Sequence, residues 1–152
     1  MNQARDFFLR CKQCQTKNRI PRSKIGTVAK CGRCKSDIDT RELLQSAPLI
    51  VTDANFEETI LQSSLPVLMD CWATWCSACA TLSPVLETLA RDFKGRFRVA
   101  KLNVETNPIL TARYDLRSLP SLLIFDKGQL KDTLVGALPK EVIFQKMSPY
   151  IG

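Results

Sequence analysis

The chain has 152 residues, of which 45% are hydrophobic and 24% are charged, and its formal net charge at pH 7 is +7. This length allows one ordinary domain, or a small domain with an appendage. The apolar content is sufficient for a proper core, so the chain does not depend on disulfide bonds to fold.

The first fourteen residues, MNQARDFFLRCKQC, carry charges that include Arg5, Asp6 and Arg10, and they contain no apolar stretch of signal-peptide length. Nothing later in the chain resembles a membrane span. We therefore expect a cytoplasmic protein that makes no membrane contact. In that compartment cysteines stay reduced unless they bind metal or perform redox chemistry, so the seven cysteines need a role.

The positive charge is concentrated in the first part of the chain. Residues 1–45 contain eleven Lys and Arg against four Asp and Glu, whereas the two kinds balance in residues 46–152. No aromatic residue lies between Leu9 and Asn55. These shifts predict a small basic domain, 1–45, and a neutral core-forming domain, 46–152, with the boundary near Ser46-Ala47-Pro48.

The basic segment contains two C-x-x-C pairs, Cys11/Cys14 and Cys31/Cys34, separated by sixteen residues. This spacing is typical of a zinc ribbon, in which two knuckles supply four thiolates to one tetrahedral Zn²⁺. Because the chain has no histidine, any tetrahedral site must be all-cysteine. Gly32 is expected where a knuckle turn needs a left-handed or crowded backbone. The few β-formers in between predict a small hairpin without a core, so metal binding would supply the folding energy. Two vicinal disulfides, or idle thiols, are the alternative.

The basic charge of this segment also raises the question of nucleic-acid binding. Four thiolates on Zn²⁺ carry a net charge of −2, which reduces the charge of the module to about +5. We expect no aromatic platform on which single-stranded bases could stack. A solvated basic face is therefore favoured, and nucleic acid is not expected as a partner.

The second domain gives a readable order of elements. A short strand is predicted at Leu49–Val51, then a helix through Phe56–Leu61 capped by Asp53, then a buried strand from Pro66 to Cys71. A helix with a kink at Pro84 follows Cys76, with apolar residues at Leu82, Leu86, Leu89 and Phe93. After it we expect a strand at 97–104, a helix at 107–114, a hairpin of 121–125 with 129–135, and a last helix after Pro139. The order βαβαβαββα predicts an α/β fold, a central mixed sheet with helices on both faces.

The third pair, Cys76 and Cys79, lies where the buried strand ends and the helix begins. Free amide groups and the helix dipole favour an anion there, which lowers the pKa of a thiol and makes it a nucleophile. Cys79 lies one turn further along the same side, close enough to bond with Cys76. A second metal site fits poorly, because Cys71 is the only cysteine left over. A redox pair is favoured over an inert buried pair.

The motif W-x-x-W-C-x-x-C after an apolar strand ending in Asp resembles the thioredoxin family, as do "SLPSLLIF" and "VGAL" further on. The resemblance covers residues 49–152. With the four-cysteine ribbon in front, the chain is similar to the zinc-binding thioredoxin 2 type of bacteria. It implies a thioredoxin fold preceded by a small zinc ribbon.

The resemblance also implies roles for particular residues. Cys76 would be the attacking cysteine and Cys79 the resolving one, with Asp70 as the buried carboxylate beneath them and Lys101 near it. The substrate-binding rim would consist of Trp75, Leu119, the cis-proline Pro120, Gly136 and Ala137.

The implied activity is that of a protein-disulfide reductase, which needs two thiol steps. The Cys76 thiolate attacks a substrate sulfur, and Cys79 then attacks Cys76 and releases the reduced substrate. Asp70 can accept the proton of Cys79, because burial raises the pKa of a carboxyl group towards neutrality. The partners implied are disulfide-containing proteins and an NADPH-dependent flavoprotein reductase, and the expected state is a monomer. No bound organic cofactor is expected.

Two positions depart from the family pattern. Ser77-Ala78 replaces the usual Gly-Pro between the cysteines, from which we expect a couple somewhat less reducing than ordinary thioredoxin. Cys71 stands where an aromatic core residue is usual, and strand alternation turns it away from Asp70, as a small buried hydrophobe. A third redox cysteine is the alternative.

Other functions stay open at this point. The domain would serve as a thiol oxidant or isomerase in an oxidising compartment. Alternatively, the ribbon would be a docking module for nucleic acid or protein, or its zinc thiolates would respond to oxidative stress.

Overall fold

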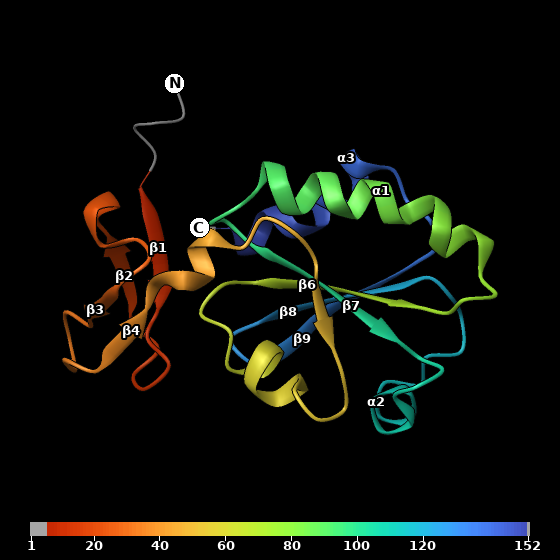
Figure 1. Ribbon diagram of the computed structural model, residues 1–152, viewed down its shortest axis with the longest axis horizontal. Coiled ribbons are helices and arrows are strands. Elements are labelled where there is room, and N and C mark those ends of the chain that lie inside the picture. Colours follow the sequence, from red (N-terminus) through yellow and green to blue (C-terminus); the bar gives the residue numbers. More distant parts are fainter. Residues whose placement is uncertain (1–5, 152) are drawn as a thin grey trace.

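The computed structural model describes residues 6–151. It consists of a small ribbon (β1 to η3, Phe7–Leu44) beside a larger sheet domain (β5 to Ile151), as Figure 1 shows. The first five residues of the predicted zinc ribbon and the final Gly152 lie outside the described residues.

The ribbon contains two antiparallel hairpins. They are formed by β1 (Phe7–Arg10) with β2 (Lys17–Ile20), and by β3 (Val28–Lys30) with β4 (Asp37–Asp39). Short 3₁₀ turns, η2 (Arg22–Lys24) and η3 (Thr40–Leu44), follow the two hairpins. Each hairpin presents one C-x-x-C pair in the loop between its strands.

The two cysteine loops have the same backbone pattern. The amide of Cys11 donates to the carbonyl of Thr16 at 2.8 Å, and the amide of Cys31 donates to that of Ser36 at 2.9 Å. The left-handed residue of each loop directly follows the pair: Gln15 has φ 65° and Lys35 has φ 67°. The prediction for Gly32 is therefore wrong, because a Cβ there would meet nothing closer than an oxygen at 3.6 Å.

The expectation that the ribbon has no core is also wrong. Its hairpins bury a small apolar cluster that includes Leu9, Ile20, Ile38 and Leu43. Leu65, which belongs to the sheet domain, completes this cluster. The ribbon thus packs on its neighbour through shared apolar contacts.

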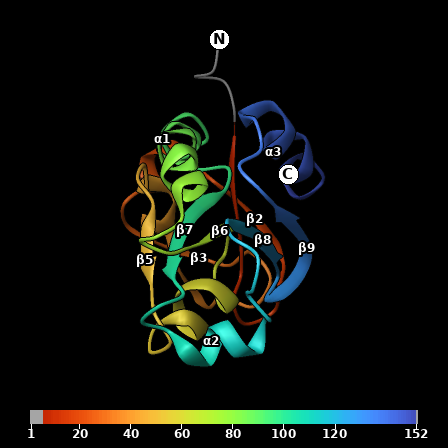
Figure 2. The same cartoon turned by 90° about the vertical axis from the view of Figure 1, so that its right-hand side faces the viewer.

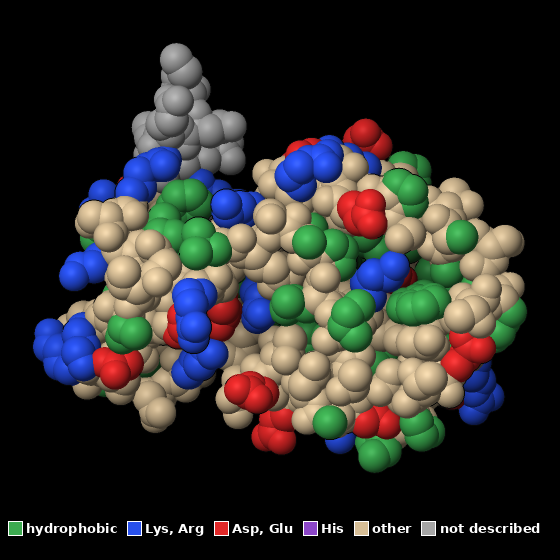
Figure 3. All heavy atoms as spheres, viewed as in Figure 1, with side chains coloured by type: hydrophobic (Ala, Val, Ile, Leu, Met, Phe, Trp, Pro, Cys, Tyr) green, Lys and Arg blue, Asp and Glu red, His purple; other side chains and the backbone are tan. Residues whose placement is uncertain are grey.

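The ribbon carries two aromatic residues, contrary to the expectation of none. Phe7 and Phe8 lie in β1, just before the aromatic-free interval of the sequence. Two guanidinium groups contact the ring of Phe7: that of Arg22 lies 5.5 Å and that of Arg96 4.9 Å from the ring centroid. Cation–π contacts within the protein therefore already engage this ring. Figure 3 shows the Lys and Arg side chains gathered over the ribbon, as the charge distribution predicts.

The sheet domain has five strands in the order β5-β7-β6-β8-β9. Their bounds are β5 (Leu49–Val51), β6 (Val67–Trp72), β7 (Arg98–Asn103), β8 (Ser121–Asp126) and β9 (Gln129–Val135). β5, β6 and β7 run parallel, and β8 and β9 are antiparallel, which makes the sheet mixed as predicted.

Helices cover both faces of this sheet, as Figures 1 and 2 show. α1 (Ser77–Asp92) and α3 (Lys140–Met147) cover one face, and η4 (Glu57–Leu61) and α2 (Pro108–Arg113) cover the other. A 3₁₀ turn, η5 (Ser148–Tyr150), follows α3. Among the residues described, no helix is long and apolar enough to cross a membrane.

The predicted order of elements is confirmed, with two local differences. The first helix is a single π-type turn, η4, rather than an α-helix. Asp53 does not cap it. Its carboxylate accepts from the amides of Ile109 and Leu110 at 3.1 and 2.9 Å and so caps α2, more than fifty residues away. The contact forms because β5, which precedes Asp53, pairs in parallel with β7, which precedes α2. The spacing of residues in the sequence does not reveal this pairing.

A buried ion pair joins the ribbon to the sheet domain. Glu42 of η3 lies 3.5 Å from the guanidinium of Arg98, at the start of β7, and both side chains are 11% exposed. The same carboxylate accepts from the amide of Ser64 at 2.9 Å and pairs with Lys12 at 3.1 Å. Removal of one partner from such a buried pair generally costs about 3–5 kcal/mol, because the other charge stays buried. The contact between the ribbon and the sheet domain therefore combines a defined ion pair with apolar packing.

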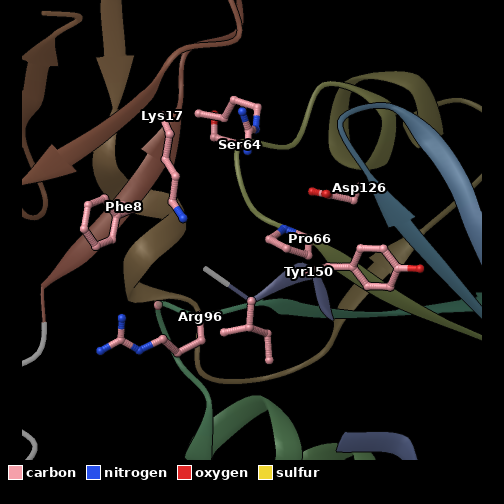
Figure 4. Close-up of a pocket in the computed structure, with 10 residues that line it drawn as sticks. Phe8, Lys17, Ser64, Pro66, Arg96, Asp126 and Tyr150 are labelled. Carbon is pink, nitrogen blue, oxygen red and sulfur yellow. The ribbon is translucent and has the colours of Figure 1, made fainter. Parts of the chain in front are cut away.

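A close backbone approach completes the junction. Gly95 has φ +82°, and a Cβ there would lie 2.6 Å from the ring of Phe7. Figure 4 shows the cleft beside it, where Phe8 and Lys17 of the ribbon face Pro66 and Asp126 of the sheet domain.

The ribbon lies at the end of the sheet where β6 begins. Ser64 and Leu65, which contact the ribbon, lie just before Pro66 and β6, whereas Cys76 follows the other end of the strand. Six strand residues span about 20 Å. The two cysteine centres therefore lie at opposite ends of β6.

Candidate functional site

The loop from β6 to α1 positions Cys76 at a helix terminus. Cys76 is the N-cap of α1, with an extended backbone, and its sulfur accepts from the amide of Cys79 at 3.2 Å. The helix dipole and this free amide both favour negative charge on the sulfur. The predicted position of the pair is confirmed.

Cys76 and Cys79 form a disulfide, with their Cα atoms 5.3 Å apart. Both are nearly buried, 8% and 4% exposed, and pack with Ala73, against which Trp72 and Leu119 lie. A pocket of about 280 Å³ opens beside them. The two cysteines therefore pack against apolar side chains and also line an open pocket.

Asp70 lies beneath the pair in β6. It is fully buried, and neither carboxylate oxygen has a hydrogen-bond partner among the described residues. Burial raises the pKa of this carboxyl group to about 7, and the Lys101 ammonium opposes the rise. A carboxyl group with this pKa can both hold and release a proton at neutral pH.

Lys101 is the register partner of Asp70 on β7, so both side chains leave the sheet on the face that α1 covers. Its ammonium group nevertheless does not bond to Asp70. It donates to the hydroxyl of Ser83 in α1 at 3.1 Å and lies 5.3 Å from the ring of Trp72.

The residues of the predicted substrate rim lie on three loops. Trp75 is 70% exposed, the Leu119–Pro120 peptide bond is cis, and Leu119 packs against the cysteine cluster. The amide of Gly136 donates to the Pro120 carbonyl at 2.9 Å, which ties the loop after β9 to the cis-proline. Ala137 follows it and is exposed.

Cys71 points away from this site. It is fully buried in the core on the other face of the sheet, beside Leu102. Burial raises the pKa of its thiol, and the charge of Asp70 raises it further. A thiol in this environment behaves as a small apolar side chain, as the sequence predicts.

Sequence reasoning missed two groups that contact residues of this site or of its loop. One is Ser83, whose position one turn after Cys79 places it on the same side of α1. The other is Glu105, whose carboxylate accepts from the amide and the hydroxyl of Thr74 at 2.7 and 2.9 Å. This contact braces the loop that carries Trp75, and its 31-residue separation leaves no signal in the sequence.

The four ribbon cysteines form a separate cluster. The sulfurs of Cys11, Cys14, Cys31 and Cys34 all lie within 4.8 Å of one another, and the Cys11–Cys34 and Cys14–Cys31 distances are 3.5 and 3.6 Å. Four sulfurs about 2.3 Å from a tetrahedral Zn²⁺ would be about 3.8 Å apart, so the donor set fits this ion.

Hydrogen bonds favour the thiolate form of Cys31 in this cluster. The amide of Cys34 and the side-chain amide of Asn18 contact the sulfur of Cys31 at 3.5 and 3.4 Å and lower the pKa of its thiol to about 5. A thiolate is the form that binds a metal ion.

Comparisons with known proteins agree with both centres. The family model described as "Thioredoxin" matches residues 47–149, and that described as "Thioredoxin 2, N-terminal" matches residues 10–36. The chain belongs to the thioredoxin family. Similar relatives include "Thioredoxin" of Chlorobaculum thiosulfatiphilum, 48% identical over 66% of this chain and 94% of that protein. "Thioredoxin 2" of Chlorobaculum tepidum is 46% identical over 66% and 93%, and "Thioredoxin" of Synechocystis is 42% identical over 70% and 99%.

Thioredoxins are protein-disulfide oxidoreductases, so this chain is a thiol-disulfide oxidoreductase, and its Cys76–Cys79 pair fits the redox-active site. The mixed sheet with helices on both faces is the thioredoxin fold expected from the sequence. The second match and the four-cysteine cluster are those of a thioredoxin with an N-terminal zinc ribbon.

Proposed function

We propose that this thioredoxin reduces protein disulfides, with Cys76 as the attacking and Cys79 as the resolving cysteine. The observation that carries the assignment is the position of the Cys76 sulfur at the N-cap of α1, where it accepts the Cys79 amide. The Cys76 thiolate attacks a substrate sulfur and displaces one substrate thiolate. Cys79 then loses its proton and attacks Cys76, which reforms the Cys76–Cys79 disulfide and releases the second substrate thiolate.

Asp70 is the proposed acceptor for the proton of Cys79. The carboxylate takes the proton as the S–H bond breaks, and it does so near neutral pH because its pKa is raised to about 7. Lys101 is the charged group that opposes this rise. Trp75, Leu119, Pro120, Gly136 and Ala137 form the proposed docking rim, with the exposed ring of Trp75 offering the largest apolar contact.

The raised pKa of Asp70 predicts a pH-dependent stability of the oxidised protein. Between pH 4 and 7 the folded state holds a proton that the unfolded state has lost, so stability falls as the pH rises through this window. The fall amounts to about 4 kcal/mol for a shift from 3.8 to about 7. In Asp70→Asn this fall is expected to vanish, as measured by urea denaturation from pH 4 to 8.

A matched control is Asp92→Asn. Asp92 is exposed, and its hydrogen bond with Lys140 lowers the pKa of its carboxyl group. That variant should keep the wild-type decline between pH 4 and 7. An Asp70→Asn protein with the same decline would show that another group titrates.

The electrons are proposed to come from an NADPH-dependent flavoprotein reductase. The sequence contains no glycine-rich nucleotide loop of its own, so the organic cofactor would belong to this partner. Disulfide-containing proteins are the proposed substrates, and a monomer is the proposed working state.

Cys11, Cys14, Cys31 and Cys34 are proposed to hold one structural Zn²⁺, which would link the two hairpins of the ribbon when bound. The proposed domain bounds are 1–45 for the ribbon and 46–152 for the thioredoxin domain. A bacterial cytoplasm is the proposed location, because a reducing compartment keeps these four thiols, which are unpaired in the structure, available to the metal.

The reduction potential of the Cys76–Cys79 couple tests the direction of electron flow. We expect a value somewhat above the −270 mV typical of thioredoxin and far below about −120 mV, measured by equilibration with glutathione with zinc bound. In a Ser77→Gly/Ala78→Pro variant the reduction potential of the couple should fall towards about −270 mV. A wild-type value near the oxidising end would instead indicate a disulfide donor or isomerase.

A further inference from the structure

The pocket beside the disulfide is lined by a hydrogen bond between Lys101 and Ser83, and neither residue has a part in the two exchange steps. Ser83, Lys101 and Trp72 line this pocket together with both active-site cysteines. Ser83 lies in α1, four residues after Cys79, and its hydroxyl accepts from the Lys101 ammonium at 3.1 Å. The pocket has a volume of about 280 Å³, enough for several water molecules at about 30 Å³ each.

Two hydrogen-bond acceptors for the Lys101 ammonium lie on the same face of the sheet: the hydroxyl of Ser83 and the carboxylate of Asp70. Asp70 is its register partner, and both oxygens of that carboxyl group lack a hydrogen-bond partner among the described residues. The ammonium instead donates a hydrogen bond to Ser83 and lies over the ring of Trp72. Among the described residues, no hydrogen bond joins this ammonium to the buried carboxyl group.

This separation matters for the proton of Cys79. An opposite charge in direct contact lowers the pKa of a carboxyl group by about 1–3 units, and the resulting ion pair is a weak proton acceptor at neutral pH. At its present place Lys101 opposes the effect of burial on Asp70 without cancelling it.

We propose that Ser83 is a positioning residue for the resolving step: its hydroxyl holds the Lys101 ammonium at the pocket and out of hydrogen-bonding contact with Asp70. The proposal rests on the proposed function, in which Asp70 takes the proton of Cys79. In that step the S–H bond of Cys79 breaks and an O–H bond forms on Asp70. The Cys79 thiolate then forms the S–S bond with Cys76, and the substrate thiolate leaves with the electron pair. Ser83 touches none of the reacting atoms and acts through Lys101.

Few ionisable groups surround the buried carboxyl group. β7 contributes Lys101, and the N-cap and first turn of α1 contribute the two active-site cysteines, which do not titrate in the disulfide. Cys71 is next along β6 but points to the opposite face, and β8 places Leu122 opposite Asp70. A change in the titration of Asp70 in the oxidised protein can therefore be traced to Lys101.

The test is the titration of Asp70 in the full-length oxidised, zinc-loaded protein, followed by ¹³C NMR of its carboxyl carbon. In Ser83→Ala the ammonium loses its acceptor, and the carboxylate oxygens of its register partner Asp70 have no other hydrogen-bond partner among the described residues. We expect the pKa of Asp70 to fall by about one unit, a tenfold change in its acid constant. The pH profile of substrate release from the mixed disulfide should shift in the same direction.

Three further variants make the result specific. Ser83→Thr keeps a hydroxyl and should restore the wild-type titration. Thr88→Ala removes another hydroxyl of α1, which donates to the carbonyl of Pro84, and should leave Asp70 unchanged. In the Lys101→Met background, Ser83→Ala should have no further effect on the pKa of Asp70.

An unchanged or raised pKa of Asp70 in Ser83→Ala would overturn the proposal, as would a shift that persists without Lys101. These outcomes are separate from a failure of the proposed function. Trapping of substrate on Cys76 in a Cys79→Ser variant does not depend on the titration of Asp70, so its failure would count against the exchange mechanism itself.

Discussion

A Cys79→Ser variant is expected to remain covalently attached to its substrate, whereas Cys76→Ser should neither turn over nor attach. The sulfur of Cys76 is the one that lies at the helix N-cap and accepts an amide hydrogen bond. It is therefore the sulfur whose thiolate is stabilised for attack. Without Cys79 the mixed disulfide on Cys76 has no internal nucleophile to resolve it.

The expected loss of turnover is at least about 1,000-fold for either variant, equivalent to about 4 kcal/mol or more, because a serine hydroxyl cannot supply the electrons for disulfide exchange. The trapped species is measured on a non-reducing gel after reaction with a disulfide-containing protein, and dithiothreitol should release it. Trapping by Cys76→Ser, and not by Cys79→Ser, would reverse the assignment.

Cys71→Ala provides the control for this experiment. Its thiol is buried on the other face of the sheet, where burial raises the thiol pKa, so the variant should turn over substrate at the wild-type rate. A large loss of turnover in Cys71→Ala with an unchanged fold would instead favour a third redox cysteine.

Removal of zinc is expected to unfold the ribbon and to leave the thioredoxin domain folded. Structural zinc sites of this kind contribute about 10–16 kcal/mol at pH 7, far more than the small apolar cluster of the ribbon can replace. The two large core clusters of the thioredoxin domain share no residue with that of the ribbon. Loss of the ribbon would therefore expose Leu65 and the Arg98 side chain without opening the main core.

Amide hydrogen exchange before and after chelation measures this difference. Protection should disappear in β1 to β4 and persist in β6 to β8. A Cys14→Ser/Cys31→Ser variant should match the chelated protein without any chelator, because it lacks two ligands. A ribbon that stays protected without zinc would contradict a structural role for the metal. Loss of protection in β6 would show that the Glu42–Arg98 junction unfolds both parts together.

Local patterns were sufficient for most of the elements. The apolar run before Cys71, the helical period after Cys76 and the Asp126-Lys127-Gly128 turn each correspond to an observed element, because backbone geometry depends on near neighbours. Apart from Gly32 and the π-type turn η4, the errors concern contacts between distant segments. Asp53 caps α2 instead of η4, and the ribbon core depends on Leu65. Phe7 directly precedes the aromatic-free part of the sequence, and pairing of β1 with β2 brings it into the ribbon.

By itself the sequence determined the chemistry that the two cysteine centres can perform, because C-x-x-C spacing and a strand-to-helix junction are local properties. It also determined the order of the elements, and from that order the mixed sheet. Only the tertiary structure decided which acceptor holds the Lys101 ammonium. Asp70 is its register partner on the neighbouring strand, but the packing of α1 on the sheet brings the hydroxyl of Ser83 to 3.1 Å. The tertiary structure likewise placed the ribbon at the far end of β6, since buried charges such as Glu42 and Arg98 find their partners only when distant segments pack together.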